Sequence, residues 1–252
     1  MTVGADSAFF DLAVGGIDGV EVDFERVIGK LKPGAHLLAL SPIATHHSNT
    51  ISIEDAGMEI RDTVVWVFDS GGQTPDMVLV TVARKPLEGT VAANVLAHGT
   101  GGLNVDGCRV QGPGAMKWET PRGGIWSTDS EATAPLVQNT QGRWPANLIH
   151  DNSPSVVAMF PNTGSGNGKG GYCYAGREYD NKDSSMFNGD KPQAPSNYND
   201  NGTAARFFYS APCLDSLIAY MLKLITQPNG TVLTNCDKDK LPNGYNYVGQ
   251  EL

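Results

Sequence analysis

The sequence predicts an α/β protein, and three observations carry that prediction. Helical and strand-like segments alternate over residues 1–87, the stretch from 99 to 202 is dominated by glycine, proline, serine and asparagine, and a strand, a helix and another strand follow it. Alternation of this kind is typical of a sheet with helices packed on it. With 40% apolar residues, the 252-residue chain can bury a core of one large or two small domains.

Apolar spacing places the elements of the first part. A period of 3.6 residues predicts a short helix over 22–31. The run HLLAL predicts a buried strand over 36–40. A second helix is expected to begin at Ser48 or Asn49 and to end at Gly57.

Two β-branched runs, 59–68 and 76–86, predict a pair of strands joined by a turn at Gly71-Gly72. In the last fifty residues we expect four elements: a strand in ARFFYSA at 205–211, a helix in CLDSLIAYMLKLIT at 213–226, and short strands at 231–233 and 245–248. The low aliphatic content of 161–203 predicts long loops.

Charge and cysteine content limit the functional classes. The formal net charge of -9 argues against tight, sequence-independent binding to a polyanion, although it leaves room for a local basic patch. The four cysteines show no C-x-x-C spacing, which favours reduced thiols over a zinc site or a disulfide framework. No membrane-spanning run or secretory signal is visible, so we expect a cytoplasmic protein, in the host cytoplasm if the chain is viral.

Several segments, in order along the chain, resemble those of phage-type DNA amino-methyltransferases. They include KLKPGAHLLAL, EGTVAANVLAHGTGGLNVDGCRV, GRWPANLIHD and LIAYMLKLITQPNGTVL. Enzymes of this family use S-adenosylmethionine to methylate adenine N6 or cytosine N4 in DNA. The resemblance implies a doubly wound, Rossmann-like sheet in a truncated form. It assigns 1–87 to the catalytic half, 88–203 to a loop-rich target-recognition region and 204–252 to a remnant of the cofactor half that completes the same sheet.

The family's catalytic motif is Asp-Pro-Pro-Tyr after a strand. Its first residue and a backbone carbonyl accept hydrogen bonds from the exocyclic amine, and its ring stacks on a flipped base. Here the matching stretch is FFDLAVGG, so the resemblance makes Asp11 the candidate catalytic residue, while Leu12, Ala13 and Val14 replace Pro-Pro-Tyr. The alternative is an ordinary solvated aspartate at a strand end, because reaction geometry tolerates little misplacement.

The family's cofactor motif is a glycine-rich turn after a strand, followed by a crossover helix and a strand that ends in an acid. The stretch VLTNCDKDKLPNG at 232–244 lacks this turn, and only about a dozen residues separate Leu233 from Tyr245, the minimum for a parallel crossover. We therefore expect the crossover helix to be missing. Glu251 stands in the place of the ribose-binding acid; the alternative is a solvated glutamate.

The resemblance also implies candidate DNA-binding residues: Arg143, Trp144 and Asn147 in GRWPANLIHD, and Arg109 at the end of EGTVAANVLAHGTGGLNVDGCRV. The arginines would contact phosphate or a guanine edge and Trp144 would stack on a base. The alternative makes Trp144 a local packing anchor capped by Arg143. The His46-His47 pair and His98 lack partner ligands at metal-binding spacing, and the glycine-rich stretch 164–172 lacks the ending of a phosphate loop.

Three functional hypotheses follow. The first is a DNA methyltransferase that transfers a methyl group from S-adenosylmethionine to an exocyclic amine. The second, suggested by the missing motifs, is a catalytically inactive protein that keeps the fold to bind DNA, a host enzyme or another subunit, with DNA mimicry against a restriction enzyme as one version; the acidic charge favours protein partners. The third is an active enzyme whose cofactor site is rearranged or completed by a second subunit.

Overall fold

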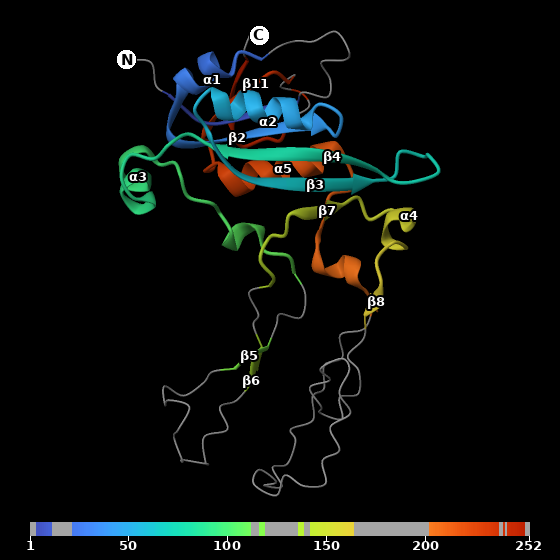
Figure 1. Cartoon of the computed structure of the whole chain (residues 1–252). Helices are drawn as coiled ribbons and strands as arrows, with labels where there is room; N and C mark the ends of the chain where they lie inside the picture. Colours follow the sequence, from blue (N-terminus) through green and yellow to red (C-terminus); the bar gives the residue numbers. More distant parts are fainter. Residues whose placement is uncertain are drawn as a thin grey trace, which may run out of the picture.

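The computed structural model describes residues 4–11, 22–111, 116–118, 136–138, 142–163, 202–236, 239 and 241–249. Its main feature is an eight-stranded sheet with the strand order β10-β7-β3-β4-β2-β1-β11-β12 (Figure 1). The strands are β1 (Ala5–Asp11), β2 (Leu31–Pro42), β3 (Glu59–Phe68), β4 (Asp76–Arg84), β7 (Leu148–His150), β10 (Tyr209–Ser210), β11 (Thr231–Thr234) and β12 (Asn246–Gly249). Only β4 runs antiparallel to its neighbours within this sheet.

Helices cover both faces of the sheet. The α-helices are α1 (Phe24–Lys30), α2 (His46–Asp55), α3 (Val91–His98), α4 (Pro154–Val157) and α5 (Leu214–Ile225), and the 3-10 helices are η1 (Asp106–Cys108) and η2 (Ala204–Phe207). Two short ladders, β5 (Met116–Trp118) with β6 (Leu136–Gln138) and β8 (Asn162–Thr163) with β9 (Gly202–Thr203), lie outside the main sheet. None of the described helices combines the length and the apolarity needed to cross a membrane.

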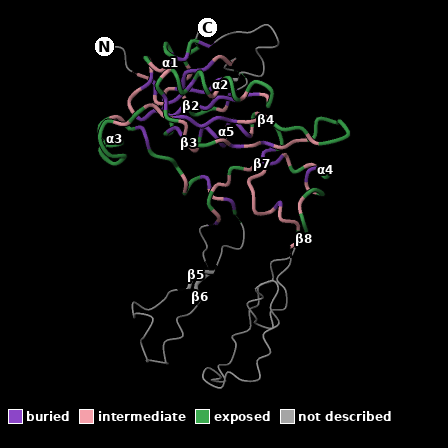
Figure 2. Tube along the Cα trace, viewed as in Figure 1, coloured by how far each residue is buried: buried purple, intermediate pink, exposed green. Residues whose placement is uncertain are grey.

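Two apolar cores lie on opposite faces of the sheet because successive side chains of a strand point to opposite sides. Phe10 and Leu37 pack with residues of α1 and α2, whereas Phe9 and Leu38 pack with α5. The buried segments run along the central strands (Figure 2). The α/β class and the doubly wound arrangement are therefore confirmed.

The structure also confirms most of the predicted elements. The helices α1, α2 and α5 and the strands β2, β3, β4, β11 and β12 fall where the apolar patterns place them, with ends that differ by a few residues. α5 is the most regular case: six of its twelve residues are buried. Helix α2 begins two residues before the expected Ser48.

The predicted strand over 205–211 is wrong for most of its length. Residues 204–207 form η2, and only Tyr209 and Ser210 pair with β7. The Arg206 guanidinium folds back and donates hydrogen bonds to the carbonyl oxygens of Gly202 and Thr203. These local bonds stabilise a tight turn in a sequence whose aromatic residues otherwise favour a strand.

Helix α3 was not predicted, although its ends carry clear signals. The Thr90 side chain accepts a hydrogen bond from the Ala93 N–H, and Gly99 closes the helix with a left-handed backbone at φ 74°. The helix lacks an apolar stripe facing a core: Asn94 is its one buried residue, and Leu96 is 89% exposed. Periodicity therefore gave no indication of it.

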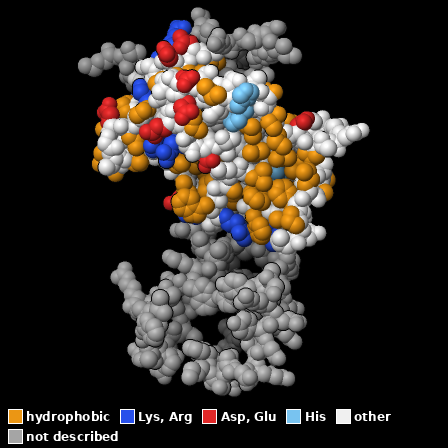
Figure 3. All heavy atoms as spheres, viewed as in Figure 1, with side chains coloured by type: hydrophobic (Ala, Val, Ile, Leu, Met, Phe, Trp, Pro, Cys, Tyr) orange, Lys and Arg blue, Asp and Glu red, His pale blue; other side chains and the backbone are white. Residues whose placement is uncertain are grey.

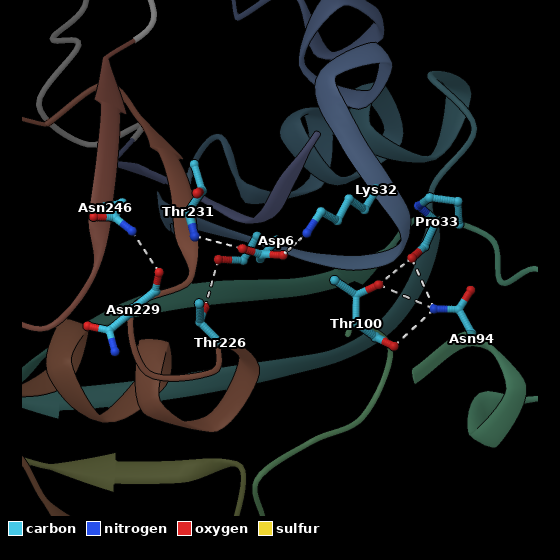
Figure 4. Close-up of polar contacts among 10 residues, drawn as sticks. Asp6, Lys32, Pro33, Asn94, Thr100, Thr226, Asn229, Thr231 and Asn246 are labelled. Carbon is cyan, nitrogen blue, oxygen red and sulfur yellow. Dashed lines mark hydrogen bonds and ion pairs between the residues drawn. The ribbon is translucent and has the colours of Figure 1, made fainter. Parts of the chain in front are cut away.

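Polar contacts tie the amino ends of the strands together (Figure 4). The Asn94 side chain donates to the carbonyl oxygens of Pro33 and Thr100 and accepts a hydrogen bond from the Glu88 N–H. The bond to Pro33 anchors α3 to the first residues of β2. The hydroxyl groups of Ser7 and Thr226 lie 2.7 Å apart and join β1 to the end of α5. These contacts fix the amino edge and leave the opposite edge for the candidate site.

Candidate functional site

The carboxyl ends of β1 and β11 lie side by side, although more than two hundred residues separate them in the chain. The register pairs Ser7 with Val232 and Phe9 with Thr234. From β1 the chain proceeds through α1 to β2 on one side, and from β11 it proceeds to β12 on the other. Such a reversal of strand order is a topological switch point, and ligands of open α/β sheets bind outside the strand ends at this position.

The candidate catalytic residue Asp11 is the last residue of β1, and its backbone is in register with Leu40 of β2. It therefore lies at the switch point. The side chain of Asp11 and the segment 12–21, which contains the replacements for Pro-Pro-Tyr, lie outside the described residues. The same holds for Glu251, the candidate cofactor-binding acid, which follows β12.

The connection from β11 to β12 takes the place that a crossover helix would occupy. Among its described residues (235, 236, 239 and 241–245) there is no α-helix. Leu241 is 8% exposed and packs into the core on the α5 face, while the Tyr247 hydroxyl donates to the Pro242 carbonyl oxygen at 2.7 Å. The described part of the connection is thus packed against the sheet without forming an α-helix.

This geometry bears on whether S-adenosylmethionine fits. Close approach of a ligand to the backbone requires glycine after the strand. The described residues that follow Thr234 are Asn235 and Cys236, and the Cys236 N–H is already bonded to the Thr234 hydroxyl at 3.0 Å. The described residues after β11 therefore lack the glycine-rich turn that would let S-adenosylmethionine approach the backbone at the switch point.

Two side chains of the GRWPANLIHD segment make hydrogen bonds that stabilise the fold at the carboxyl edge of the sheet. His150, buried in β7, accepts the Asn152 N–H at Nδ1 and donates from Nε2 to the Ala205 carbonyl oxygen at 3.1 Å. Asp151 accepts the Asp69 N–H at 2.8 Å. Burial raises the pKa of Asp151, but its hydrogen bonds from backbone N–H groups and from Ser153 outweigh this and leave the pKa below its ordinary value.

A cluster of cations and aromatic rings forms a second candidate site, which we call the arginine–aromatic cluster. Its members are Arg109, Arg143, Trp144, Arg206 and Phe207. The Arg109 guanidinium carbon lies 5.4 Å from the centre of the Trp144 ring. The guanidinium carbons of Arg143 and Arg206 lie 4.0 and 4.2 Å from the centre of the Phe207 ring. All three distances are within the range of cation–π attraction.

A backbone bridge builds this cluster. Val110 and Arg143 exchange two backbone hydrogen bonds of 3.0 and 2.9 Å, which places residue 109 beside residue 144. Gly142 makes the bridge possible: its φ is +83°, and a Cβ there would lie 2.6 Å from the Val110 carbonyl oxygen. Arg109 is further oriented by Asp106, whose carboxylate accepts from its Nε at 2.8 Å.

The structure brings three of the four predicted DNA-binding residues together and separates the fourth. Trp144 is 67% exposed, so the packing-anchor alternative is wrong. The Arg143 guanidinium lies over Phe207, and the guanidinium of Arg109 lies over Trp144. Asn147 donates from its side chain to the Asp62 carboxylate at 2.6 Å and thereby links its segment to β3.

Sequence reasoning missed Arg206 and Phe207. They reach the cluster through η2, about sixty residues from Arg143 in the chain, and the ARFFYSA pattern predicted a strand at this place. No spacing in the sequence relates η2 to the Val110–Arg143 bridge. Their place in the cluster is visible only in the tertiary structure.

Metal binding finds no support among the residues that the structure describes, since no group of three or more His, Cys, Asp or Glu side chains occurs there. His46 Nδ1 lies 3.4 Å from the Thr81 hydroxyl. His98 pairs with Glu88 at 2.8 Å.

No protein-family model matches the chain, and no curated protein sequence matches it. Among solved structures it is similar to M1.HpyAVI in complex with SAM, with 10% identity, a TM-score of 0.40 and coverage of 98% of this chain and 81% of that chain. A second M1.HpyAVI structure gives 8% identity, a TM-score of 0.42 and the same coverage. A candidate DNA modification methylase from Thermus thermophilus gives 13% identity and a TM-score of 0.28 over 34% of this chain and 47% of that chain. Similarities at this level do not establish a function for this chain.

Proposed function

We propose that this protein binds DNA on a methyltransferase-like sheet without catalysing methyl transfer on its own. The observation that carries the proposal is the arginine–aromatic cluster, in which three guanidinium groups lie next to Trp144 and Phe207. Arginine is suited to phosphate oxygens and guanine edges, and aromatic rings are suited to bases. In this proposal 1–87 and 204–252 build the scaffold and 88–203 supplies most of the contact surface.

The distribution of charge reconciles this proposal with a net charge of -9. In the view of Figure 3, Lys and Arg side chains lie next to Asp and Glu side chains in the upper part of the described surface, and further Lys and Arg side chains lie at its lower end. The arginines of the cluster offer a local contact area for an anion on a protein whose net charge is repulsive. It should therefore bind DNA in one orientation and release it readily as salt increases.

The test is a titration of a fluorescein-labelled oligonucleotide followed by anisotropy. We expect binding that weakens when Arg143 is changed to Gln, because one phosphate or base contact is lost, while Arg61→Gln on the exposed part of β3 serves as the control. Equal binding by both variants, or no binding by the unmodified protein, would contradict the proposal.

A second candidate function is transfer of a methyl group from S-adenosylmethionine to adenine N6 or cytosine N4 of DNA. The pairing of Phe9 with Thr234 favours it, because it puts the end of β1 beside the end of β11 at the switch point. In this candidate Asp11 accepts a hydrogen bond from the target amine and Glu251 binds the ribose. The connection after β11 opposes it, because Asn235 and Cys236 offer no glycine for close approach.

Calorimetric titration separates the two candidates. Binding of S-adenosylmethionine and S-adenosylhomocysteine in the micromolar range, followed by incorporation of a labelled methyl group that Asp11→Ala abolishes, would establish the second candidate. No heat of binding up to millimolar ligand, together with DNA binding, is the result expected from the first.

A further inference from the structure

We infer that the arginine–aromatic cluster binds unpaired DNA in preference to duplex DNA, with Trp144 as the platform on which an exposed base stacks. This inference deepens the proposed function and rests on its assignment of DNA as the ligand.

The Trp144 ring is exposed and held in place. A tryptophan that is 67% exposed leaves a large apolar surface in water, whereas tryptophans of folded proteins are on average well buried. The ring is also held in place, because Arg143 next to it is fixed by the bridge to Val110 and the Arg109 guanidinium lies over the ring at 5.4 Å. A fixed and exposed indole ring can stack on a base without first becoming ordered.

Duplex and single-stranded DNA differ in how accessible the faces of their bases are. In a duplex both faces of an internal base are covered by its neighbours, so an aromatic side chain can stack only on an end or on a base that has left the helix. In a single strand the faces are available, and stacking on an aromatic side chain contributes about 1–3 kcal/mol per base.

Short, irregular elements carry the cluster. The major groove of a duplex admits a helix or a two-stranded ribbon. Arg143 comes from an isolated backbone bridge, and Arg206 and Phe207 come from the four-residue η2. Neither is a helix or a ribbon long enough to follow the major groove, so the cluster is better suited to a flexible strand.

Electrostatic interactions also favour unpaired DNA. Because Arg109 is already paired with the Asp106 carboxylate, the cluster can neutralise only a few phosphates, and the net charge of -9 disfavours the closely spaced phosphates of a duplex. A single strand has a lower charge density, and stacking adds a contribution that salt screens little. The two effects together favour the unpaired form.

The experiment compares two fluorescein-labelled probes of the same length, a single strand and a blunt duplex, by anisotropy at two salt concentrations. We expect the single strand to bind at least tenfold more tightly. Trp144→Ala should weaken single-strand binding by about 5- to 150-fold, the equivalent of the stacking energy of one base. Trp144→Phe should retain most of the binding, because an aromatic face remains.

Two further measurements keep the inference testable. Leu96→Ala removes an exposed apolar side chain of α3 and should leave binding unchanged. Stacking should also quench the fluorescence of the unmodified protein more than that of Trp144→Phe. Equal affinity for both probes, or no effect of Trp144→Ala on single-strand binding, overturns the inference but leaves DNA binding intact. Failure to bind either probe overturns the proposed function as well.

Discussion

The Asp6 carboxylate accepts a hydrogen bond from the Thr231 backbone N–H at 2.7 Å, across 225 residues of chain. Its other oxygen accepts from the Lys32 ammonium group at 2.6 Å (Figure 4). One side chain on β1 thus holds the starts of both neighbouring strands, β2 and β11. At their carboxyl ends the same two strands flank the end of β1 at the switch point.

Replacement of Asp6 by alanine should destabilise the protein by about 2–3 kcal/mol, because two charge-assisted hydrogen bonds are lost at a partly buried position. Asp6→Asn should have a smaller effect, since its amide oxygen can still accept from one of the two donors. Urea unfolding monitored by circular dichroism measures the difference. A loss below about 0.5 kcal/mol for alanine would show that the bridge contributes little.

Gly142→Ala should destabilise the protein by about 2 kcal/mol or more and weaken DNA binding. A side chain at φ +83° is strained, and the new Cβ would collide with the Val110 carbonyl oxygen. Gly29→Ala is the matched control. Gly29 lies within α1, its φ is ordinary and nothing lies within 4 Å of an added Cβ, so alanine there should stabilise the helix by about 0.5–1 kcal/mol. If both variants behaved alike, the bridge would not depend on Gly142.

Stability should fall as pH decreases from about 6.5 to about 4, and His36 should contribute to this fall. Burial, together with the nearby charges of Arg84 and Arg61, lowers the pKa of His36 from 6.5 to about 4. In this range the unfolded chain takes up a proton at His36 and the folded protein does not, so unfolding becomes more favourable by about 3 kcal/mol in total. The measurement is urea unfolding at pH 7, 5.5 and 4.5. His36→Leu should show a flatter profile, and an unchanged profile would exclude His36 as a source.

Asn94→Ala should cost about 3 kcal/mol, because the side chain is fully buried and makes hydrogen bonds to Pro33, Thr100 and Glu88. Asn246 offers a comparison: its amide donates to the Asn229 carbonyl oxygen at 2.7 Å, but at an exposed position. Asn246→Ala should cost about 1 kcal/mol or less. Thermal unfolding of the two variants checks the order, which would be reversed if burial did not decide the cost.

Local patterns were sufficient where an element buries a stripe of apolar side chains. α5 and β4 are such elements, and both were predicted close to their observed bounds. The pattern failed at α3, whose one buried residue is the polar Asn94, and at 205–211, where the Arg206 side chain folds onto nearby carbonyl oxygens. In both places hydrogen bonds, which leave no periodic trace, determine the backbone.

The candidate site shows the same division. Arg109, Arg143 and Trp144 were predicted from the resemblance, yet Arg206 and Phe207 could not be, because η2 meets the Val110–Arg143 bridge only in three dimensions. For Asn147 the structure gives a bond to Asp62 on β3.

The sequence by itself determined the fold class, the positions of most strands and helices, and the absence of a glycine-rich turn after Leu233, because these depend on residue type and local spacing. Only the tertiary structure decided that β1 and β11 are neighbours, that Leu241 packs where a crossover helix would lie, and that Trp144 is exposed beside Arg109. Pairing between distant strands and the exposure of a side chain depend on long-range contacts, which no local pattern contains.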